Sequence, residues 1–263
     1  IHGEFLYQTK REIIDGGNES IIAHELFHHW FGDLVTCESW SNLPLNESFA
    51  NYSQFLWDDF EHGRMEADMN AYGEMEGYFM SAQQGGHVDM IRFDYKSKED
   101  MFDGHSYNKG GRILNMLRSY VGDDAFFASL KLYLTENAHK SAEIHDLRLA
   151  FEETTGEDLN WFFNQWFLSS GHPVLKYEQE YNAETKKLTV SITQKQDTEK
   201  WPVYKLPIYI DIYVGGKPRR EMVWVENVEN TFEFNASSEP NLVNIDAKKV
   251  LLAKKTDKKS LEQ

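Results

Sequence analysis

The residues best suited to chemistry form the short run His24-Glu25-Leu26-Phe27-His28, and Asn46-Glu47 follows eighteen residues after His28. A helix advances about 3.6 residues per turn, so His24 and His28 lie on one face, where two imidazoles can hold one metal ion. Two imidazoles and one carboxylate suit Zn²⁺, and a catalytic zinc site leaves its fourth position to water. We therefore predict one Zn²⁺ per chain, bound by His24, His28 and, from a second helix, Glu47.

Glu25 lies about 100° further round the same helix, within reach of a water on that metal. A carboxylate there can take the proton of the water as it attacks a carbonyl, and can pass that proton to the leaving amine. Glu25 is therefore the predicted general base. The alternative is an amphipathic helix with exposed histidines. That alternative does not explain why a helix starts at Asn18 and a second one at Asn46-Glu47.

Hydrophobic periodicity predicts the elements that position these residues. Gly16-Gly17 breaks the chain before a predicted helix over 18–31, and a loop over 33–45 leads to a second helix over 46–60. The second helix has an apolar stripe of Phe49, Tyr52, Phe55 and Leu56. Residues 2–10 alternate in part and predict a strand or the exit of one. Further helices are predicted over 61–80, over 109–121, from residue 123 onward, over 144–154 and over 158–168.

After Pro173 the period changes from helical to alternating, which is typical of strands. About seven short strands are predicted, and Gly215-Gly216 indicates a hairpin turn between two of them. The predicted fold class is α+β and multidomain. Residues 1–171 form a mostly helical portion, residues 172–253 form a β-sandwich, and residues 254–263 form a Lys-rich polar tail or linker.

Composition limits the partners of the chain. Its 27 basic and 43 acidic residues give a net charge of −16, with −17 in residues 1–171 and +1 in residues 172–263. Nucleic acid is therefore not expected as a partner, whereas an acidic region favours a cationic substrate such as a peptide with a free α-ammonium group. A merely solvated acidic surface explains most of these charges equally well. Cys37 is the only cysteine, so no internal disulfide is expected.

Targeting signals are not recognisable in this sequence. No apolar run approaches the ~20 residues that span a bilayer, so no membrane span is expected. The chain opens Ile1-His2-Gly3, with no initiating Met and no basic-then-apolar start. This start indicates a piece of a longer protein whose N-terminal and C-terminal parts are missing, so the compartment stays open.

Three segments together resemble the aminopeptidase N-like zinc metallopeptidases, which are gluzincins. The first runs from His24 to Gly32, the second is Leu45-Asn46-Glu47-Ser48-Phe49-Ala50, and the third is Ser106-Tyr107-Asn108-Lys109-Gly110-Gly111. The third is similar to the Y-x-K-G-A segment of that family. The resemblance covers essentially the whole chain, most firmly residues 17–172.

The resemblance implies a function for the parent protein. It implies a thermolysin-like catalytic portion and a zinc aminopeptidase that hydrolyses N-terminal residues from peptides, with Tyr107 stabilising the oxyanion. The family's G-x-M-E-N motif, whose glutamate holds the substrate amine, is not in this chain. We therefore expect the isolated chain to be weakly active or inactive. The alternatives are a thermolysin-type zinc endopeptidase and a catalytically incomplete module that only binds.

The sequence departs from the family pattern in the loop between the two metal-binding segments. Asp33 stands where the family usually has Asn, and Asn42 stands where it usually has Asp. One hypothesis is an exchanged pair whose side chains meet and stiffen the loop. The other is two independent, solvent-facing substitutions. Ser48 also stands where Gly is common.

Overall fold

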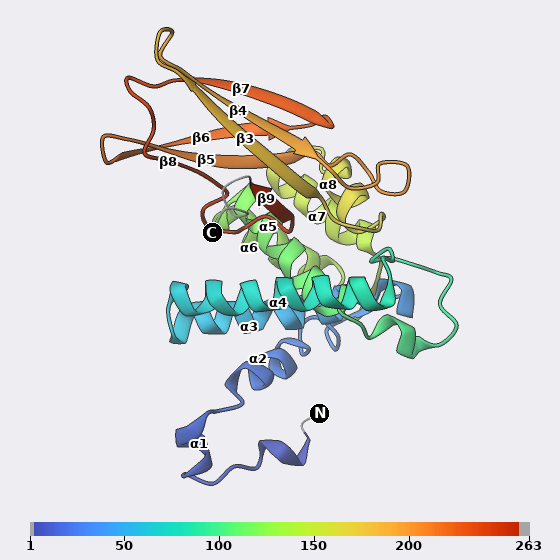
Figure 1. Ribbon diagram of the computed structural model, residues 1–263. Coiled ribbons are helices and arrows are strands. Elements are labelled where there is room, and N and C mark those ends of the chain that lie inside the picture. Colours follow the sequence, from blue (N-terminus) through green and yellow to red (C-terminus); the bar gives the residue numbers. More distant parts are fainter. Residues whose placement is uncertain (1–2, 258–263) are drawn as a thin grey trace. The chain divides into compact units, whose positions relative to one another are not determined.

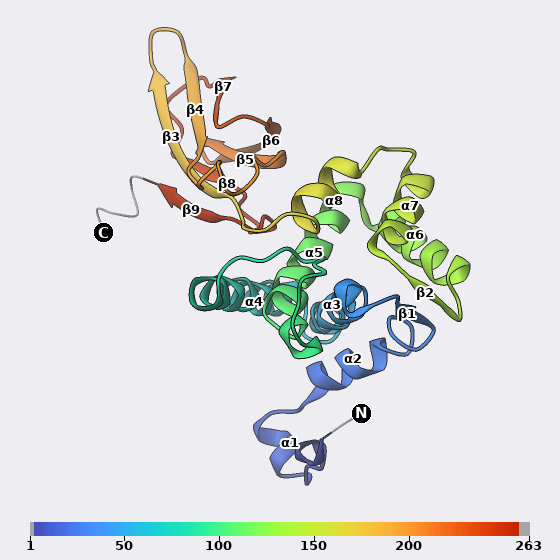
Figure 2. The ribbon, with the colours of Figure 1, turned by 90° about the vertical axis from the view of Figure 1, so that its right-hand side faces the viewer.

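The computed structural model describes residues 3–257, and the chain falls into two compact units, residues 1–168 and 169–263. The first unit consists mainly of helices and the second of strands, as Figures 1 and 2 show. This change of secondary structure follows the change of period that the sequence predicts near Pro173. Among the described residues, no helix combines the length and the apolar character that crossing a bilayer requires.

The first unit is built around helix α3, which contacts α2, α4 and α5. Pro44 occupies the first position of α3, where its missing N–H costs no helical hydrogen bond. The predicted stripe of Phe49, Tyr52 and Phe55 is buried. The helices are α1 (Glu12–Asp15), α2 (Glu19–Phe27), α3 (Pro44–Glu61), α4 (Arg64–Gly85), α5 (Gly110–Val121), α6 (Asp123–Glu136), α7 (Ile144–Thr155) and α8 (Asn160–Trp166).

A short parallel ladder ties the loop after α2 to the chain after α6. Strand β1 (Val35–Cys37) pairs with β2 (Lys140–Ala142). Next to it, the ring of Phe31 stacks on that of Phe49 with centroids 4.0 Å apart, which joins the end of α2 to α3. These contacts fix the two helices that carry the predicted metal ligands.

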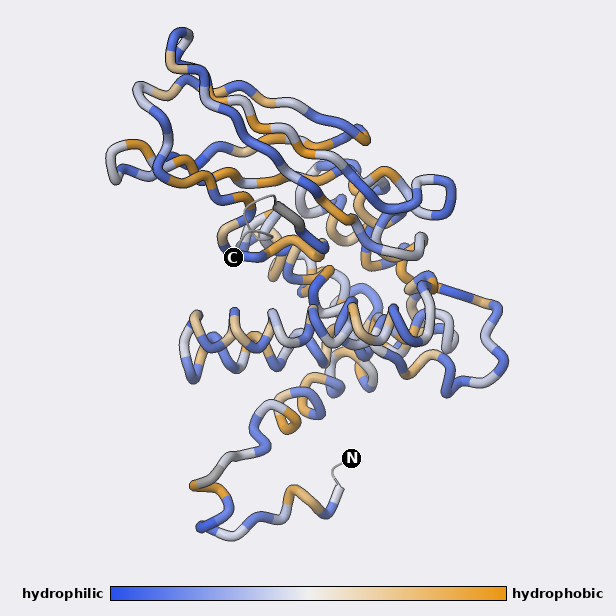
Figure 3. The backbone as a smooth tube through the Cα atoms, viewed as in Figure 1, coloured by the Kyte–Doolittle hydropathy of each residue, from blue (hydrophilic) through white to orange (hydrophobic). Residues whose placement is uncertain are grey.

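The outer face of α2 is apolar yet exposed. Figure 3 shows apolar residues along this helix, and Ile21, Ile22 and Leu26 are 36%, 39% and 50% exposed. In this structure α2 packs on α3 on one side only and has no fully buried residue of its own. These three apolar side chains therefore remain partly exposed in the described part of the chain.

The second unit contains two β-sheets, in which most neighbouring strands are antiparallel. Their orders are β7-β4-β3-β9, in which β9 pairs with β3 in parallel, and β6-β5-β8. Alternate residues Ile208, Ile210 and Ile212 of β5 are buried, as the alternation predicts. Both Gly215 and Gly216 have positive φ, which is what the predicted hairpin turn between β5 and β6 requires. The strands are β3 (Val174–Asn182), β4 (Lys187–Gln194), β5 (Leu206–Val214), β6 (Lys217–Val225), β7 (Glu229–Asn235), β8 (Leu242–Ile245) and β9 (Lys254–Asp257).

Two predictions at the chain ends differ from the structure. The strand predicted over 2–10 is wrong for the described residues, because Glu4–Leu6 forms a 3₁₀ turn instead. Residues 254–257, predicted as part of a tail, form β9 because they find a partner in β3, and Lys255 pairs with Asp246. Residues 258–263 of the predicted tail, and residues 1–2, lie outside the described residues. The predicted division into domains stays a prediction.

Candidate active site

His24, His28 and Glu47 converge where α2 crosses the start of α3. Glu47 Oε2 lies 3.3 Å from Nε2 of His24 and 3.4 Å from Nε2 of His28. One ligand atom of each residue lies within 4.8 Å of the others. The arrangement follows from local rules, because His24 in α2 and His28 at its C-cap are four positions apart, and Glu47 lies in the first turn of α3. The structure thus brings together all three residues that the sequence predicts as ligands.

The donor set fits a zinc ion. Glu47 Oε2 is buried and makes no hydrogen bond of standard geometry within the described chain, although the Nε2 atoms of His24 and His28 lie close by. A metal ion would satisfy such an oxygen. His28 Nδ1 lies 3.1 Å from the Phe31 carbonyl oxygen. If Nδ1–H donates to this carbonyl, the lone pair of Nε2 is left to face the ligand cluster. Two imidazole nitrogens and a carboxylate are ligands that zinc prefers.

The charges of this cluster also suit a cation. Burial alone would raise the pKa of the Glu47 carboxyl, but the adjacent imidazoles of His24 and His28 outweigh burial and lower that pKa to about 2. Burial alone would lower the pKa of His28, but the Glu47 carboxylate, the Phe31 carbonyl and the Glu25 carboxylate together outweigh burial and raise that pKa. Glu47 is therefore ionised at neutral pH.

Tyr107 reaches the same cluster from a different part of the chain. It lies in a single π-helical turn, His105–Lys109, immediately before α5. Its ring is parallel to that of His24, with centroids 5.9 Å apart and planes inclined by 8°. Burial and the nearby Glu47 carboxylate raise the pKa of Tyr107 above its usual range, so the phenol keeps its proton and can donate it. Glu25, half-buried on α2, completes the predicted set.

The turn that carries Tyr107 is held by close packing against α3. The Ser48 hydroxyl donates a hydrogen bond of 2.7 Å to the buried Ser106 carbonyl oxygen. A Cβ at Gly110 would fall 1.8 Å from Ser48 Oγ, so only glycine fits at this position. Ser48, noted in the sequence as a departure from the family pattern, is thus a direct support of the Tyr107 turn.

Side chains from before the turn also hold it. Asp103 Oδ1 accepts hydrogen bonds from the backbone N–H groups of His105 and Ser106, each 3.0 Å long. Arg92 donates to Asp103 Oδ2 at 2.9 Å and to the Asp100 carbonyl at 2.6 Å. Sequence reasoning missed Asp103 and Arg92, because an acidic residue four positions before a tyrosine carries no recognisable spacing.

Two other residues near Tyr107 are buried. His105 is 3% exposed, and its Nδ1 lies 3.3 Å from Asp103 Oδ2. Lys109 is fully buried, and its Nζ makes no hydrogen bond within residues 3–257 but lies 5.7 Å from the centroid of the Tyr78 ring. Burial lowers the pKa of Lys109 to about 7.

Asp33 and Asn42 do not form the exchanged pair that one hypothesis suggests. Asp33 is exposed and pairs with the exposed His29, with Oδ2 and Nδ1 3.2 Å apart. Asn42 is buried, and its Oδ1 accepts a 3.0 Å hydrogen bond from the backbone N–H of Ile144, at the start of α7. The coupling hypothesis is therefore wrong, and the solvent-facing alternative is right for Asp33 only.

Known proteins resemble this chain in both sequence and fold. The model of the peptidase family M1 domain matches residues 6–166. An aminopeptidase N from Streptomyces lividans is 33% identical over 192 residues, which make up 70% of this chain and 22% of that protein. Aminopeptidase N from Escherichia coli is 27% identical over 233 residues, or 82% of this chain and 27% of that protein.

One further related protein and one solved structure are similar to this chain. The tricorn protease-interacting factor F2 from Thermoplasma volcanium is 32% identical over 192 residues, covering 69% of this chain and 24% of that protein. The fold is similar to the crystal structure of Legionella pneumophila aminopeptidase A, with a TM-score of 0.76 and 21% identity over 95% of this chain and 28% of that one. The chain thus spans about a quarter of the length of these relatives.

Proposed function

We propose that this chain, which belongs to the peptidase family M1, carries the zinc site and the catalytic residues of a metallo-aminopeptidase that hydrolyses N-terminal residues from peptides. One observation supports the proposal above all others. Three ligand atoms from His24, His28 and Glu47 gather within 4.8 Å, and the ring of Tyr107 lies beside them. The names of the relatives support the aminopeptidase class.

Zinc held by these three residues would supply Lewis acidity, which polarises a peptide carbonyl and makes a water more acidic. Glu25 takes the proton of the attacking water and delivers it to the leaving amine. Tyr107 donates its phenol hydrogen to the oxygen on which negative charge develops. His28 is held by the Phe31 carbonyl through Nδ1, which keeps its ring oriented toward the ligand cluster.

We further propose the finer fold that the sequence predicts. The helical unit would be part of a thermolysin-like catalytic domain, and the two strand arrangements of the second unit would form a β-sandwich. The first proposal draws on the resemblance of the sequence motifs to the family. The second draws on the alternating segments after Pro173 and on the orders of the strands.

A thermolysin-type endopeptidase remains the second candidate, because it would use the same zinc ligands and the same base. The experiment compares pairs of peptides with free and with acetylated N-termini, incubated with the zinc-loaded intact protein that carries this chain. An aminopeptidase cleaves the free peptide from its N-terminus and leaves the acetylated one intact. Cleavage of both peptides at the same internal bond would favour the endopeptidase, and binding of peptides without cleavage would favour the binding module.

A further inference from the structure

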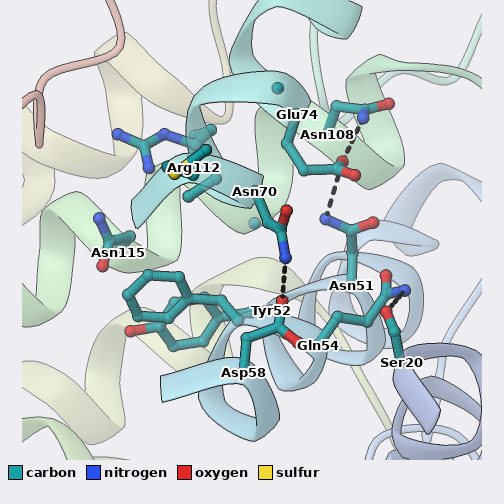
Figure 4. Close-up of a pocket in the computed structure, with 15 residues that line it drawn as sticks. Ser20, Asn51, Tyr52, Gln54, Asp58, Asn70, Glu74, Asn108, Arg112 and Asn115 are labelled. Carbon is teal, nitrogen blue, oxygen red and sulfur yellow. Dashed lines mark hydrogen bonds between the residues drawn. The ribbon is translucent and has the colours of Figure 1, made fainter. Parts of the chain in front are cut away.

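The carboxylate of Glu74 bridges two asparagine side chains that belong to different parts of the candidate active site. Glu74 Oε2, from α4, accepts hydrogen bonds from Asn108 Nδ2 and, at 3.4 Å, from Asn51 Nδ2. Figure 4 shows Glu74 between the two amides, with the dashed lines converging on its carboxylate. All three residues are partly buried, and they line one wall of a cavity of about 310 Å³.

Each asparagine stands next to a residue of the site. Asn51 lies one helical turn after the metal ligand Glu47 on α3, and Asn108 follows Tyr107 directly in the π-helical turn. A single carboxylate on a third helix therefore connects the helix of a metal ligand to the turn that carries the phenol. The bonds of a charged acceptor to amide donors are stronger than those between neutral groups, which makes this connection stiff.

Close packing around the amides leaves them little freedom. A Cβ at Gly111 would lie 2.8 Å from Asn51 Nδ2, and a Cβ at Gly77 would lie 3.5 Å from Asn108 Nδ2. Glycines at these positions make room for the two amides between α3, α4 and α5. Because Asn108 is joined directly to Tyr107 along the backbone, a shift of the Asn108 side chain would be passed to the Tyr107 turn.

We propose that Glu74 is a positioning residue, which sets the place of the Tyr107 phenol relative to the metal ligands through its bonds to Asn108 and Asn51. This proposal rests on the proposed function for its effect on catalysis. Glu74 is not among the three clustered ligand residues. A phenol shifted by a fraction of an ångström would donate less well to the developing oxyanion, and turnover would fall while substrate binding stayed nearly the same.

The test exchanges the amide and the carboxylate of the Asn108–Glu74 hydrogen bond, in the intact, zinc-loaded protein. Asn108→Asp sets two carboxylates against each other, and we expect kcat to fall at least about tenfold, with KM and zinc content little changed. In the double variant Glu74→Gln/Asn108→Asp, the new amide can donate to the new carboxylate and still accept from Asn51. We expect kcat to return to within about threefold of the unchanged protein. Glu66→Gln, an exposed carboxylate on the same helix, is the matched control.

Two further measurements separate positioning from mere stability. Because Glu74 acts through Tyr107, Asn108→Asp should not lower kcat further in a Tyr107→Phe background. A 3-fluorotyrosine at position 107 should show a shifted ¹⁹F resonance in Asn108→Asp and the original resonance in the double variant. The ¹⁹F result does not need turnover, so an inactive protein with these shifts contradicts the proposed function and leaves the positioning intact. An unmoved resonance, or losses in kcat that multiply with Tyr107→Phe, would overturn the proposal.

Discussion

The rings of His24 and Tyr107 lie parallel, 8° apart in orientation, with their centroids separated by 5.9 Å. These two residues are 83 positions apart in the sequence, one on α2 and one in the turn before α5. Their contact places a phenol whose proton is retained at neutral pH beside an imidazole that is suited to a metal.

Glu25→Gln should separate metal binding from turnover. The amide keeps the shape of the side chain but cannot accept the proton of the attacking water, so kcat should fall by about 10²- to 10⁴-fold in the intact protein. Zinc content should stay at the level of the unchanged protein, because Glu25 is not among the three clustered ligand residues. Metal analysis and peptide hydrolysis on the same sample check both parts. Loss of zinc from this variant would contradict the assignment of Glu25 as the base.

Tyr107→Phe should lower kcat with little change in KM. Removal of the phenol hydroxyl takes away a donor that acts only when charge develops, and we expect a loss of roughly 10²-fold or more. Phenylalanine keeps the ring that lies against His24, so the metal site should be undisturbed. Steady-state kinetics checks this, and a near-normal kcat would remove Tyr107 from the mechanism.

Two glycine substitutions should change stability in opposite directions. Gly110→Ala would place a methyl group against Ser48 and should destabilise the fold by about 1–3 kcal/mol. Gly73 lies within α4, and a Cβ there meets no atom within 4 Å, so Gly73→Ala should stabilise the fold by about 0.5–1 kcal/mol. Urea unfolding of both variants checks the signs. Equal effects in the same direction would show that the packing around Gly110 is not as tight as described.

Lys109 should make the stability of the first unit depend on pH. Burial lowers the pKa of Lys109 to about 7, well below the value of a lysine in an unfolded chain, although the Asp89 and Asp103 carboxylates favour its charge. At pH values between these two pKa values, Lys109 is protonated in the unfolded chain and deprotonated in the folded chain. The free energy of unfolding therefore rises with pH in this window, by up to about 1.4 kcal/mol per pH unit, and this contribution is lost as pH falls toward 7.

Lys109→Met tests this dependence, because it keeps a long apolar side chain and removes the titrating group. Urea unfolding at several pH values between about 7.5 and 9.5 should show a smaller slope in the variant than in the unchanged chain. The remaining titrating groups are common to both proteins, so the difference in slope reports Lys109 alone. Identical slopes would mean that the lysine keeps its ordinary pKa.

The local part of the candidate site could be predicted from the sequence. His24 and His28 are four residues apart on one helix, so their convergence needs only helical geometry. Glu47 could be added because a second amphipathic helix begins beside it. Tyr107 carries no such local signal among 13 tyrosines, and only the resemblance to a family singled it out.

The residues that hold the site in place could not be predicted, because each bonds to a partner far from it in the sequence. Glu74 bonds to side chains 23 and 34 positions away, and Ser48 bonds to a carbonyl 58 positions away. The same reason explains why β9 was predicted as a tail, since its strand partner β3 lies some 80 residues earlier. The bond of Asn42 to the backbone of Ile144 could not be predicted either, because it spans 102 positions.

Metal analysis of the purified protein tests whether His24, His28 and Glu47 together bind zinc. The unchanged chain should hold about one zinc, and His28→Ala should lose most of it, because two remaining ligands bind a zinc ion far less tightly than three. His29→Ala is the matched control, since this neighbouring histidine is exposed and pairs with Asp33 instead. Zinc retained by His29→Ala and lost from His28→Ala is the predicted result, and equal zinc in the unchanged chain and in His28→Ala would contradict the account.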